Sequence, residues 1–492
     1  MEELIARAVA AALEAGASYA DARFTSQEDE EVRVKNGAVE SLRAGSAQGV
    51  GVRALADGAW GFAATSTLTR AAVEEAARLA VRIARASAAT QQTPVALAPV
   101  EPAAGRFPAV FAEDPFEVPL AERVDLLLDC DRLMAEAGTV PLREGFLEVT
   151  REKKYFESSE GAQIYQERVE TGAGIECTAV ALDGSETQVR SYPSSHGGQT
   201  AQRGWEVVRE LDLPGHAEQI AREAEALLSA PCCPATVTDV ILESSQLALQ
   251  LHESCGHPIE LDRVLGTEAS FAGTSFLTPD KLGNFRYGSD HVNINADATL
   301  PGGLGSFPYD DEGVPGQRTQ IVREGMFTGY LSSRETAPVI GRTSSGAMRA
   351  DGYNRVPLIR MTNINLEPGD WTLEELISET KRGLYLCTNS CWSIDDKRLN
   401  FQFGTEAAYR IEDGDLGELL KNATYTGNTP DFWGGCDAIC SADEWYLWGV
   451  PNCGKGEPMQ TARVGHGVAP ARFRDVRVGV MQEEEDEEVP PA

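Results

Sequence analysis

The chain has 492 residues, of which 43 are Lys or Arg and 76 are Asp or Glu, giving a formal net charge of −33. So strong a negative charge argues against a nucleic-acid-binding surface. Hydrophobic residues make up 42% of the chain and charged residues 24%, as in soluble globular proteins, and this length corresponds to about two to four domains.

The sequence carries no export or membrane signal that we recognise. The opening Met1-Glu2-Glu3 has acid where a secretory signal has base, and no stretch approaches the roughly 20 apolar residues of a membrane-spanning helix. The 10 cysteines are a small fraction of the chain and indicate reduced thiols or metal ligands rather than a disulfide framework. We therefore expect a cytoplasmic protein with no nucleic-acid partner and no membrane partner.

Residues 1–90 are interpreted as an α/β domain, built from a helix, a β-meander and a second helix. Apolar residues at four-residue steps predict a first helix that ends near Gly16. Thr69 is the expected N-cap of the second helix. Between the helices we predict four short alternating strands, bounded by the hairpin-type turn sequences Asn36-Gly37 and Asp57-Gly58.

Residues 91–118 lose this periodicity and gain Pro and Ala, which predicts a linker. The pattern then restarts over 119–231 as a second α/β domain, with a helix ending near Gly138, strands with a turn at Asp183-Gly184, and a closing helix. The two units share a weak internal repeat. This repeat has two equally compatible explanations. One is true duplication, and the other is that any two helix–meander–helix units look alike.

Residues 235–480 combine Gly-rich loops, aromatic residues and hairpin patterns such as the one around Glu324-Gly325. They are interpreted as a mainly antiparallel β domain. The final residues, 481–492, include a run of acidic side chains that repel one another, so we expect a disordered acidic tail. The predicted fold class is therefore α+β, with two helix–β-meander–helix units followed by the β domain.

The sequence His-Glu-Ser-Cys-Gly-His at 252–257 is the candidate metal motif. His252 and His257 are five residues apart, about 140° around a regular helix, whereas the familiar zinc-peptidase motif has a spacing of four. Two such imidazoles converge on one ion only if the helix bulges or ends between them. Gly256 and Pro258 make that break plausible.

The residue types of this motif suit zinc-dependent hydrolysis. Neutral imidazoles hold Zn²⁺ with a position open for water, and Glu253, next to the first histidine, is placed to take the proton of that water. The helix follows a strand predicted for 236–242, and its expected N-cap is Ser244 or Ser245. On the motif alone, two ordinary helical histidines remain an alternative.

The local sequence does not identify a third ligand. The downstream candidates are Cys453, His466, Cys387/Cys391 and Cys436/Cys440. The spacing of the two cysteine pairs lies within the loose range for structural zinc, although buried thiols are the simpler interpretation. His466, which lies between two glycines, either orients substrate or stabilises an oxyanion, or is a hydrogen-bonded structural histidine.

Two further groups of charged residues have two interpretations each. Tyr309-Asp310-Asp311-Glu312 is either a second cation site or a solvated turn, and we expect the turn. Glu260 and Asp262 follow the motif closely. They either accept a hydrogen bond from a metal-binding histidine and so fix its tautomer, or they are surface charges.

Four long segments, 252–266, 309–313, 388–414 and 453–478, together resemble the TldD/PmbA family of metallopeptidases, and specifically its TldD branch. The resemblance covers nearly the whole chain. It implies a zinc peptidase in which one Zn²⁺ per chain is bound by His252, His257 and a cysteine matching Cys453. It also implies that Glu253 is the general base.

The resemblance further implies dimers that enclose the active site, either a homodimer or a heterodimer with a PmbA-like subunit. We therefore predict a zinc-dependent metallopeptidase that hydrolyses peptide bonds in small or unfolded peptides. One alternative is a catalytically idle, metal-bearing, peptide-binding scaffold that acts through a paired subunit. Another is a thiol or redox protein that uses Cys232-Cys233 or the spaced cysteine pairs.

Overall fold

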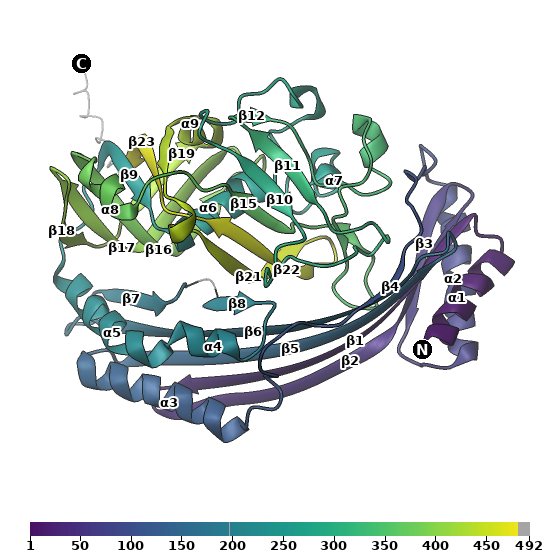
Figure 1. Cartoon of the computed structure of the whole chain (residues 1–492), viewed down its shortest axis with the longest axis horizontal. Coiled ribbons are helices and arrows are strands. Elements are labelled where there is room, and N and C mark those ends of the chain that lie inside the picture. Colours follow the sequence, from purple (N-terminus) through teal and green to yellow (C-terminus); the bar gives the residue numbers. More distant parts are fainter. Residues whose placement is uncertain (196, 481–492) are drawn as a thin grey trace, which may run out of the picture.

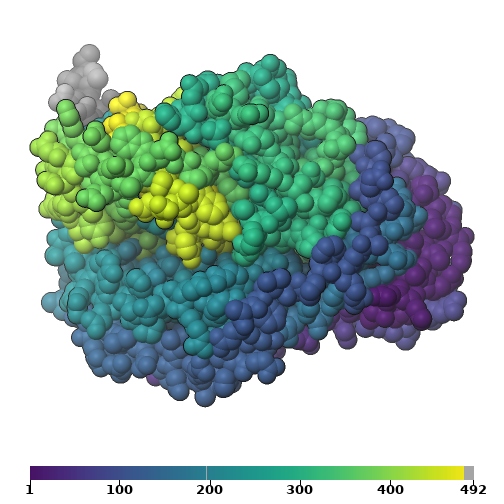
Figure 2. Space-filling view, in the orientation of Figure 1, coloured from purple at the N-terminus to yellow at the C-terminus, as the bar shows by residue number. Residues whose placement is uncertain are grey.

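The computed structural model describes residues 1–195 and 197–480, so the predicted acidic tail lies outside the described residues. Figure 1 shows a long curved sheet formed by the N-terminal half, with the β-rich C-terminal half lying on its concave side. The two halves meet along the length of the molecule in the space-filling view (Figure 2). Among the described residues, no helix is both long and apolar enough to cross a membrane.

The N-terminal half forms one eight-stranded sheet. Its strand order is β3-β2-β1-β5-β6-β4, and β7 and β8 also pair with β6. Because β1 pairs with both β2 and β5, the two predicted meanders share a single sheet. The strands are β1 (Tyr19–Lys35), β2 (Ala38–Ala56), β3 (Ala59–Thr65), β4 (Ala104–Phe107), β5 (Leu142–Ser158), β6 (Gln163–Val180), β7 (Thr187–Tyr192) and β8 (Gln199–Ala201).

The expectation of four short strands before the second helix is wrong, because β1 and β2 are continuous over 17 and 19 residues. The first ten residues of β2 lie almost entirely at the solvent-exposed surface, so their side chains show no alternation of apolar and polar types. Backbone pairing with β1 holds them in the strand all the same. The predicted turns at Asn36-Gly37 and Asp57-Gly58 are confirmed, with positive φ at all four residues.

Helices cover the two ends of this sheet (Figure 1). Thr69 is confirmed as an N-cap, because its side chain accepts a hydrogen bond from the backbone N–H of Ala72. The predicted linker contains one short strand, β4, which pairs in parallel with β6. The helices are α1 (Glu2–Glu14), α2 (Arg70–Ala88), α3 (Leu120–Ala137), α4 (Glu206–Leu211) and α5 (Leu213–Ser229).

The C-terminal half contains a six-stranded sheet of order β12-β11-β10-β15-β22-β21. All its pairings are antiparallel except β15–β22. The predicted hairpin around Glu324-Gly325 is the β11–β12 turn. The strands are β10 (Ile294–Asp297), β11 (Arg318–Arg323), β12 (Met326–Phe327), β15 (Asn363–Leu366), β21 (Tyr446–Lys455) and β22 (Gln460–Val468).

The second C-terminal sheet closes on itself. Its order is β16-β9-β23-β19-β17-β18, and β16 also pairs with β17, so five strands form a barrel. The predicted α+β class with a mainly antiparallel C-terminal half is therefore confirmed. The strands are β9 (Thr236–Leu242), β16 (Arg382–Ile394), β17 (Asn400–Glu412), β18 (Asp415–Leu420), β19 (Thr424–Asn428), β20 (Cys436–Ile439) and β23 (Ala471–Val478).

One buried helix, α6 (Ser244–Leu251), packs between the barrel and the six-stranded sheet. All eight of its residues are buried, and its leucines belong to the largest hydrophobic core of the protein. This position carries the end of the helix into the centre of the C-terminal half. The remaining short elements are α7 (Leu261–Val264), β13 (Met348–Arg349), β14 (Leu358–Ile359), α8 (Leu373–Ser378) and α9 (Thr429–Gly434).

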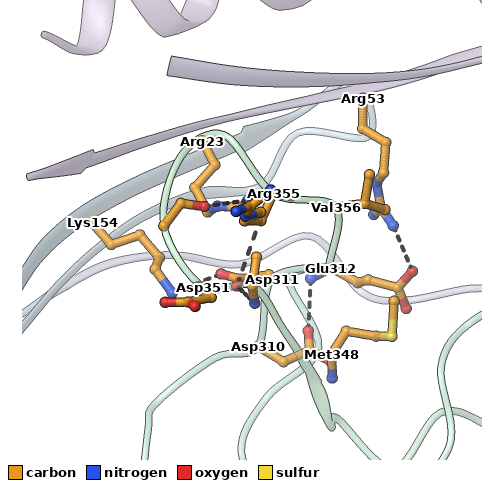
Figure 3. A network of polar contacts seen from close by, with 12 residues as sticks. Arg23, Arg53, Lys154, Asp310, Asp311, Glu312, Met348, Asp351, Arg355 and Val356 are labelled. Atoms are coloured by element: carbon orange, nitrogen blue, oxygen red, sulfur yellow. Dashed lines mark hydrogen bonds and ion pairs between the residues drawn. The ribbon is translucent and has the colours of Figure 1, made fainter. Parts of the chain in front are cut away.

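The acidic segment at 310–312 joins the two halves (Figure 3). Its three carboxylates are only 1–2% exposed. Asp311 lies 2.9 Å from the Lys154 ammonium and 3.7 Å from the Arg23 guanidinium, both on the N-terminal sheet. The segment is a turn, but the expectation that it is solvated is wrong, because cations more than 150 residues away in sequence neutralise it. We call this group of ion pairs the acidic clamp.

The acidic clamp is extended by Glu312 and Asp310. Glu312 lies 3.2 Å from Arg53, which is also paired with Asp21 at 2.7 Å. Asp310 accepts backbone N–H bonds, including one from Met348 at 3.1 Å. Burial alone would raise the pKa of Asp311, but Lys154 and Arg23 hold that pKa below its usual range.

Candidate metal centre

The helix α6 continues directly into one π-helical turn over His252–Gly256. The backbone N–H of His257 donates to the carbonyl of His252 at 3.1 Å, a five-residue step. This wider turn brings side chains at positions i and i+5 onto neighbouring faces. The predicted bulge between the two histidines is therefore confirmed. Gly256 is required here, since a Cβ at this position would lie 2.3 Å from the Met361 sulfur.

The start of α6 differs from the prediction. The N-cap is Glu243, whose carboxylate accepts from the backbone N–H of Gln246 at 3.4 Å, so the expectation of Ser244 or Ser245 is wrong. Both serines already have helical backbone conformation, and their hydroxyls donate to Glu243 at 3.0 and 2.5 Å. The carboxylate therefore gathers three donors at the start of the helix.

The structure brings Cys453 of β21 to the two histidines. One ligand atom from each of His252, His257 and Cys453 lies within 4.8 Å of the others, and all three residues are 4–5% exposed. The Cys453 sulfur is 3.7 Å from His257 Nε2. Tetrahedral zinc with ordinary Zn–S and Zn–N bonds separates these atom types by about 3.6 Å. The donor set thus fits a zinc ion in both residue type and spacing.

The other candidate ligands do not join this group. The cysteine pairs lie in other strands, Cys387/Cys391 in β16 and Cys436/Cys440 in or just after β20. Within the described part of the chain, the group of His252, His257 and Cys453 contains none of them. All ten cysteines are free thiols. Burial raises the thiol pKa of four of them above its ordinary value: Cys130, Cys255, Cys436 and Cys440.

Each histidine is backed by a second buried side chain. His252 Nδ1 lies 2.8 Å from His466 Nε2, and His257 Nδ1 lies 3.1 Å from a carboxylate oxygen of Glu260. His466 and Glu260 are both fully buried. Outer partners of this kind orient a ligating imidazole so that Nε2 faces the metal. Of the two interpretations of Glu260, the structure supports the buried partner of a histidine rather than a surface charge.

A buried lysine links this outer layer to β21. Lys455 has no exposed surface, and its ammonium lies 2.7 Å from Asp262 and 3.4 Å from Glu260. The Arg263 guanidinium is 3.5 Å from Glu260 as well. Burial alone would raise the pKa of Glu260, but Lys455, His257 and Arg263 hold it below its usual range. Asp262 is thus also a buried partner in this layer.

The Cys453 side chain lies in an electropositive environment. Burial alone would raise its pKa, but His252, His257 and Arg360 hold it well below the usual thiol range. Arg360 also donates to the backbone carbonyl of Cys453. This environment favours the thiolate, which is the form that binds a metal ion.

Glu253 is tied to the β16–β17 hairpin. It is 6% exposed, and its carboxylate accepts from Trp392 Nε1 at 3.0 Å and from Arg398 Nη1 at 2.5 Å. Burial alone would raise its pKa, but His257, His252 and Arg398 lower it. Sequence reasoning missed both hairpin residues as site residues. They lie 139 and 145 residues from Glu253, although both fall within 388–414, one of the four segments that carry the family resemblance.

Comparison with known proteins agrees with this geometry. Family models match three segments: PmbA/TldA metallopeptidase domain 1 at 20–84, the central domain at 113–228 and the C-terminal domain at 235–480. A metalloprotease of Methanocaldococcus jannaschii is 31% identical over 455 residues, covering 92% of this chain and 95% of that protein. A zinc metalloprotease TldD homolog of Saccharolobus solfataricus is 30% identical over 241 residues, covering 49% of this chain and 51% of that protein.

The overall fold is also shared with a solved structure. TldE from Thermococcus kodakarensis superposes with a TM-score of 0.69 at 18% identity, covering 97% of this chain and 100% of that one. This likeness concerns the fold, while the family models and the relatives carry the assignment. The chain therefore belongs to the TldD/PmbA metallopeptidase family, in the branch of the TldD homologues.

Proposed function

We propose that this protein is a zinc-dependent metallopeptidase that hydrolyses peptide bonds in small or unfolded peptides. The observation that carries the proposal is the convergence of His252, His257 and Cys453 with a buried carboxylate, Glu253, directly beside the first histidine. Two imidazoles and one thiolate are a donor set suited to zinc, and they leave a fourth position for water or substrate. We propose one ion per chain.

The catalytic roles follow from the contacts of the side chains. Bound zinc would lower the pKa of a water molecule and polarise the peptide carbonyl. Glu253 accepts the proton of the attacking water and delivers it to the leaving amine. Its lowered pKa keeps the carboxylate ionised at neutral pH, as a base requires. Trp392 and Arg398 fix its direction through two hydrogen bonds.

A cavity between the two halves is large enough for an extended chain but not for a folded protein. Its volume is about 490 Å³, and it lies between the N-terminal sheet and the part of β21 that precedes Cys453, where Pro451 and Asn452 line it. A volume of this size holds a short segment of peptide and excludes a folded domain. Two further parts belong to the same proposal. One is an enclosing second subunit, either a copy of this chain or a PmbA-like subunit, and the other is a cytoplasmic location.

A second function is favoured by one contact. The ion pair between Glu253 and Arg398 at 2.5 Å occupies the carboxylate that has to accept a proton. A protein in which this pair persists would be a metal-bearing peptide-binding scaffold without catalytic activity. It would bind peptide equally well with Glu253 or with Gln at that position, and it would cleave peptide in neither case.

Elemental analysis combined with an activity assay tests the proposal. We expect about one zinc per chain in the purified protein and cleavage of an unstructured casein-like substrate. Glu253→Gln should retain zinc and lose activity by about 10²–10⁴-fold, while Glu374→Gln, a matched change at an exposed position on α8, should change neither. Protein prepared without chelators that contains no zinc would contradict the proposal. If the protein binds zinc and peptide but cleaves no peptide, either by itself or together with a PmbA-like subunit, the scaffold function would be favoured.

A further inference from the structure

A second cavity lies between the two halves, on the other side of β7 and β8 from the first. Its volume is about 810 Å³, within the range of ligand-binding pockets. Its walls come from β7 and α5 on one side and from β16, β17 and β21 on the other. Five aromatic side chains line it: Tyr192, Tyr385, Tyr409, Tyr446 and Trp448. We call it the aromatic–acidic cavity.

The charges in the wall of this cavity are predominantly negative. The lining contains three carboxylates and two guanidinium groups. The carboxylates are those of Glu210, Glu223 and Glu243, and the guanidinium groups are those of Arg190 and Arg203. Arg190 lies 2.9 Å from Glu223 and 2.9 Å from Glu406 behind the wall; burial raises the pKa of Glu406 to about 7, so Glu223 is the main partner that neutralises Arg190. Arg203 is paired with Glu210 at 2.5 Å.

Glu243 is the carboxylate with no cationic partner. Among residues 1–195 and 197–480 it forms no ion pair; its contacts are the two serine hydroxyls and the N–H at the start of α6. Burial raises the pKa of Cys387 well above its ordinary value, and Glu243 raises it further, against the effect of Arg190.

The aromatic–acidic cavity is connected to the metal centre through β21 and β22. Trp448 pairs with His466 across these strands, and His466 contacts His252 at 2.8 Å. The Trp448 indole also donates to the Ser244 hydroxyl at the start of α6. The eight buried residues of α6 separate Glu243 from His252 along the chain.

We propose that the aromatic–acidic cavity binds a Lys or Arg side chain of the substrate. This inference rests on the proposed peptidase function and adds a specificity site to it. Aromatic faces attract a cation. The carboxylate of Glu243 completes the site, because its contacts among the described residues are hydrogen bonds from two hydroxyls and one backbone N–H, and no Lys or Arg pairs with it there. Backbone contacts elsewhere would leave the rest of the peptide sequence free to vary.

Paired peptides test this proposal. A series carries a single Lys at each position within five residues of the cleaved bond, and a matched series carries norleucine, which has a similar length and no charge. We expect the Lys peptide to have a kcat/KM at least about tenfold higher at one of these positions, equivalent to about 1.4 kcal/mol. In Glu243→Gln this ratio should fall toward one, whereas in Glu374→Gln it should be retained.

A binding measurement separates this inference from the proposed activity. The Lys and norleucine peptides are titrated into Glu253→Gln protein, with tryptophan fluorescence as the readout because Trp448 lines the cavity. Tighter binding of the Lys peptide, lost in the double variant with Glu243→Gln and in that with Tyr446→Ala, supports the site even if no peptide is cleaved. Zinc content confirms that each variant is folded. Equal binding of both peptides, or a preference that both variants retain, would overturn the inference.

Discussion

The metal centre and the acidic clamp are both clusters of buried ionisable side chains, but their charges are balanced in opposite ways. In the acidic clamp, two carboxylates have a cationic partner within the protein: Asp311 has Lys154 and Glu312 has Arg53. The third, Asp310, accepts backbone N–H bonds instead, and burial and the charge of Glu312 raise its pKa to about 8. In the metal centre, the donor atoms of His252, His257 and Cys453 face one another. Cations and carboxylates surround that centre only in its outer layer, as in the pair of Lys455 with Glu260.

This difference separates a structural cluster from a binding site. A buried charge is stable only if it is paired, hydrogen-bonded or bound to an ion. The acidic clamp is complete without a ligand, which is why we assign it the role of holding the two halves together. The candidate metal centre concentrates electron-pair donors, and we propose that a zinc ion is the partner that completes it.

Breaking the acidic clamp should have the largest effect on stability. Asp311→Asn leaves Lys154 and Arg23 buried without their shared carboxylate, and we expect a loss of about 3–5 kcal/mol in the free energy of unfolding. Zinc binding by the folded fraction should persist, because no metal ligand is touched. Urea denaturation measures the change, with Asp370→Asn at an exposed position as the matched control. Unchanged stability together with lost zinc would reverse the roles of the two clusters.

Acid should weaken ion pairs of the N-terminal sheet that lie beside the acidic clamp. Glu152 lies 2.8 Å from Arg168 and 3.7 Å from Lys154. Burial alone would raise its pKa, but these two cations lower it from 4.5 to about 2. The stabilisation is therefore complete above pH 4.5 and is lost as the pH falls toward 2, by about 3 kcal/mol. We expect this loss in denaturation of the zinc-free protein between pH 6 and pH 2.5.

The matched variant for the acid experiment is Glu152→Gln, which has no carboxylate to titrate. Its stability should be lower than that of the parent protein at pH 6, and the two should approach each other at acid pH. A parent and a variant that lose stability in parallel over the whole range would exclude Glu152 as the source of the effect.

The outer layer of the metal centre should show a smaller effect, on affinity rather than on folding. Glu260→Gln removes the negative charge beside His257 Nδ1. Loss of such an outer partner of a metal ligand weakens metal binding by about 10–100-fold. Competition with a zinc-binding dye measures this change, and Glu374→Gln is the control. An affinity equal to that of the parent protein would mean that His257 is oriented by other contacts.

The sequence predicted those parts of the fold that depend on neighbouring residues. The N-cap at Thr69, the turns at Asn36-Gly37 and Asp57-Gly58, and the break at Gly256 all arise from local backbone geometry. The single N-terminal sheet depends instead on the pairing of β1 with β5, which lie more than 100 residues apart. No periodicity within either strand specifies that partner.

The candidate site shows the same division. The spacing of His252 and His257 marked the metal motif, whereas Cys453 was one of several open candidates until the family resemblance singled it out. Trp392 and Arg398 reach Glu253 only through the β16–β17 hairpin. The expected solvated turn at 310–312 is buried for a related reason, because its cations come from the N-terminal sheet.

The most direct test of the metal centre is X-ray absorption spectroscopy at the zinc edge of the zinc-loaded protein. We predict one sulfur at about 2.3 Å, with nitrogen or oxygen neighbours at about 2.0–2.1 Å. In Cys453→Ser the sulfur should disappear, and in Cys391→Ser, an exposed cysteine of the β16–β17 hairpin, it should remain. A zinc shell of nitrogen and oxygen alone, or a sulfur that persists in Cys453→Ser, would contradict the assignment of Cys453 as the third ligand.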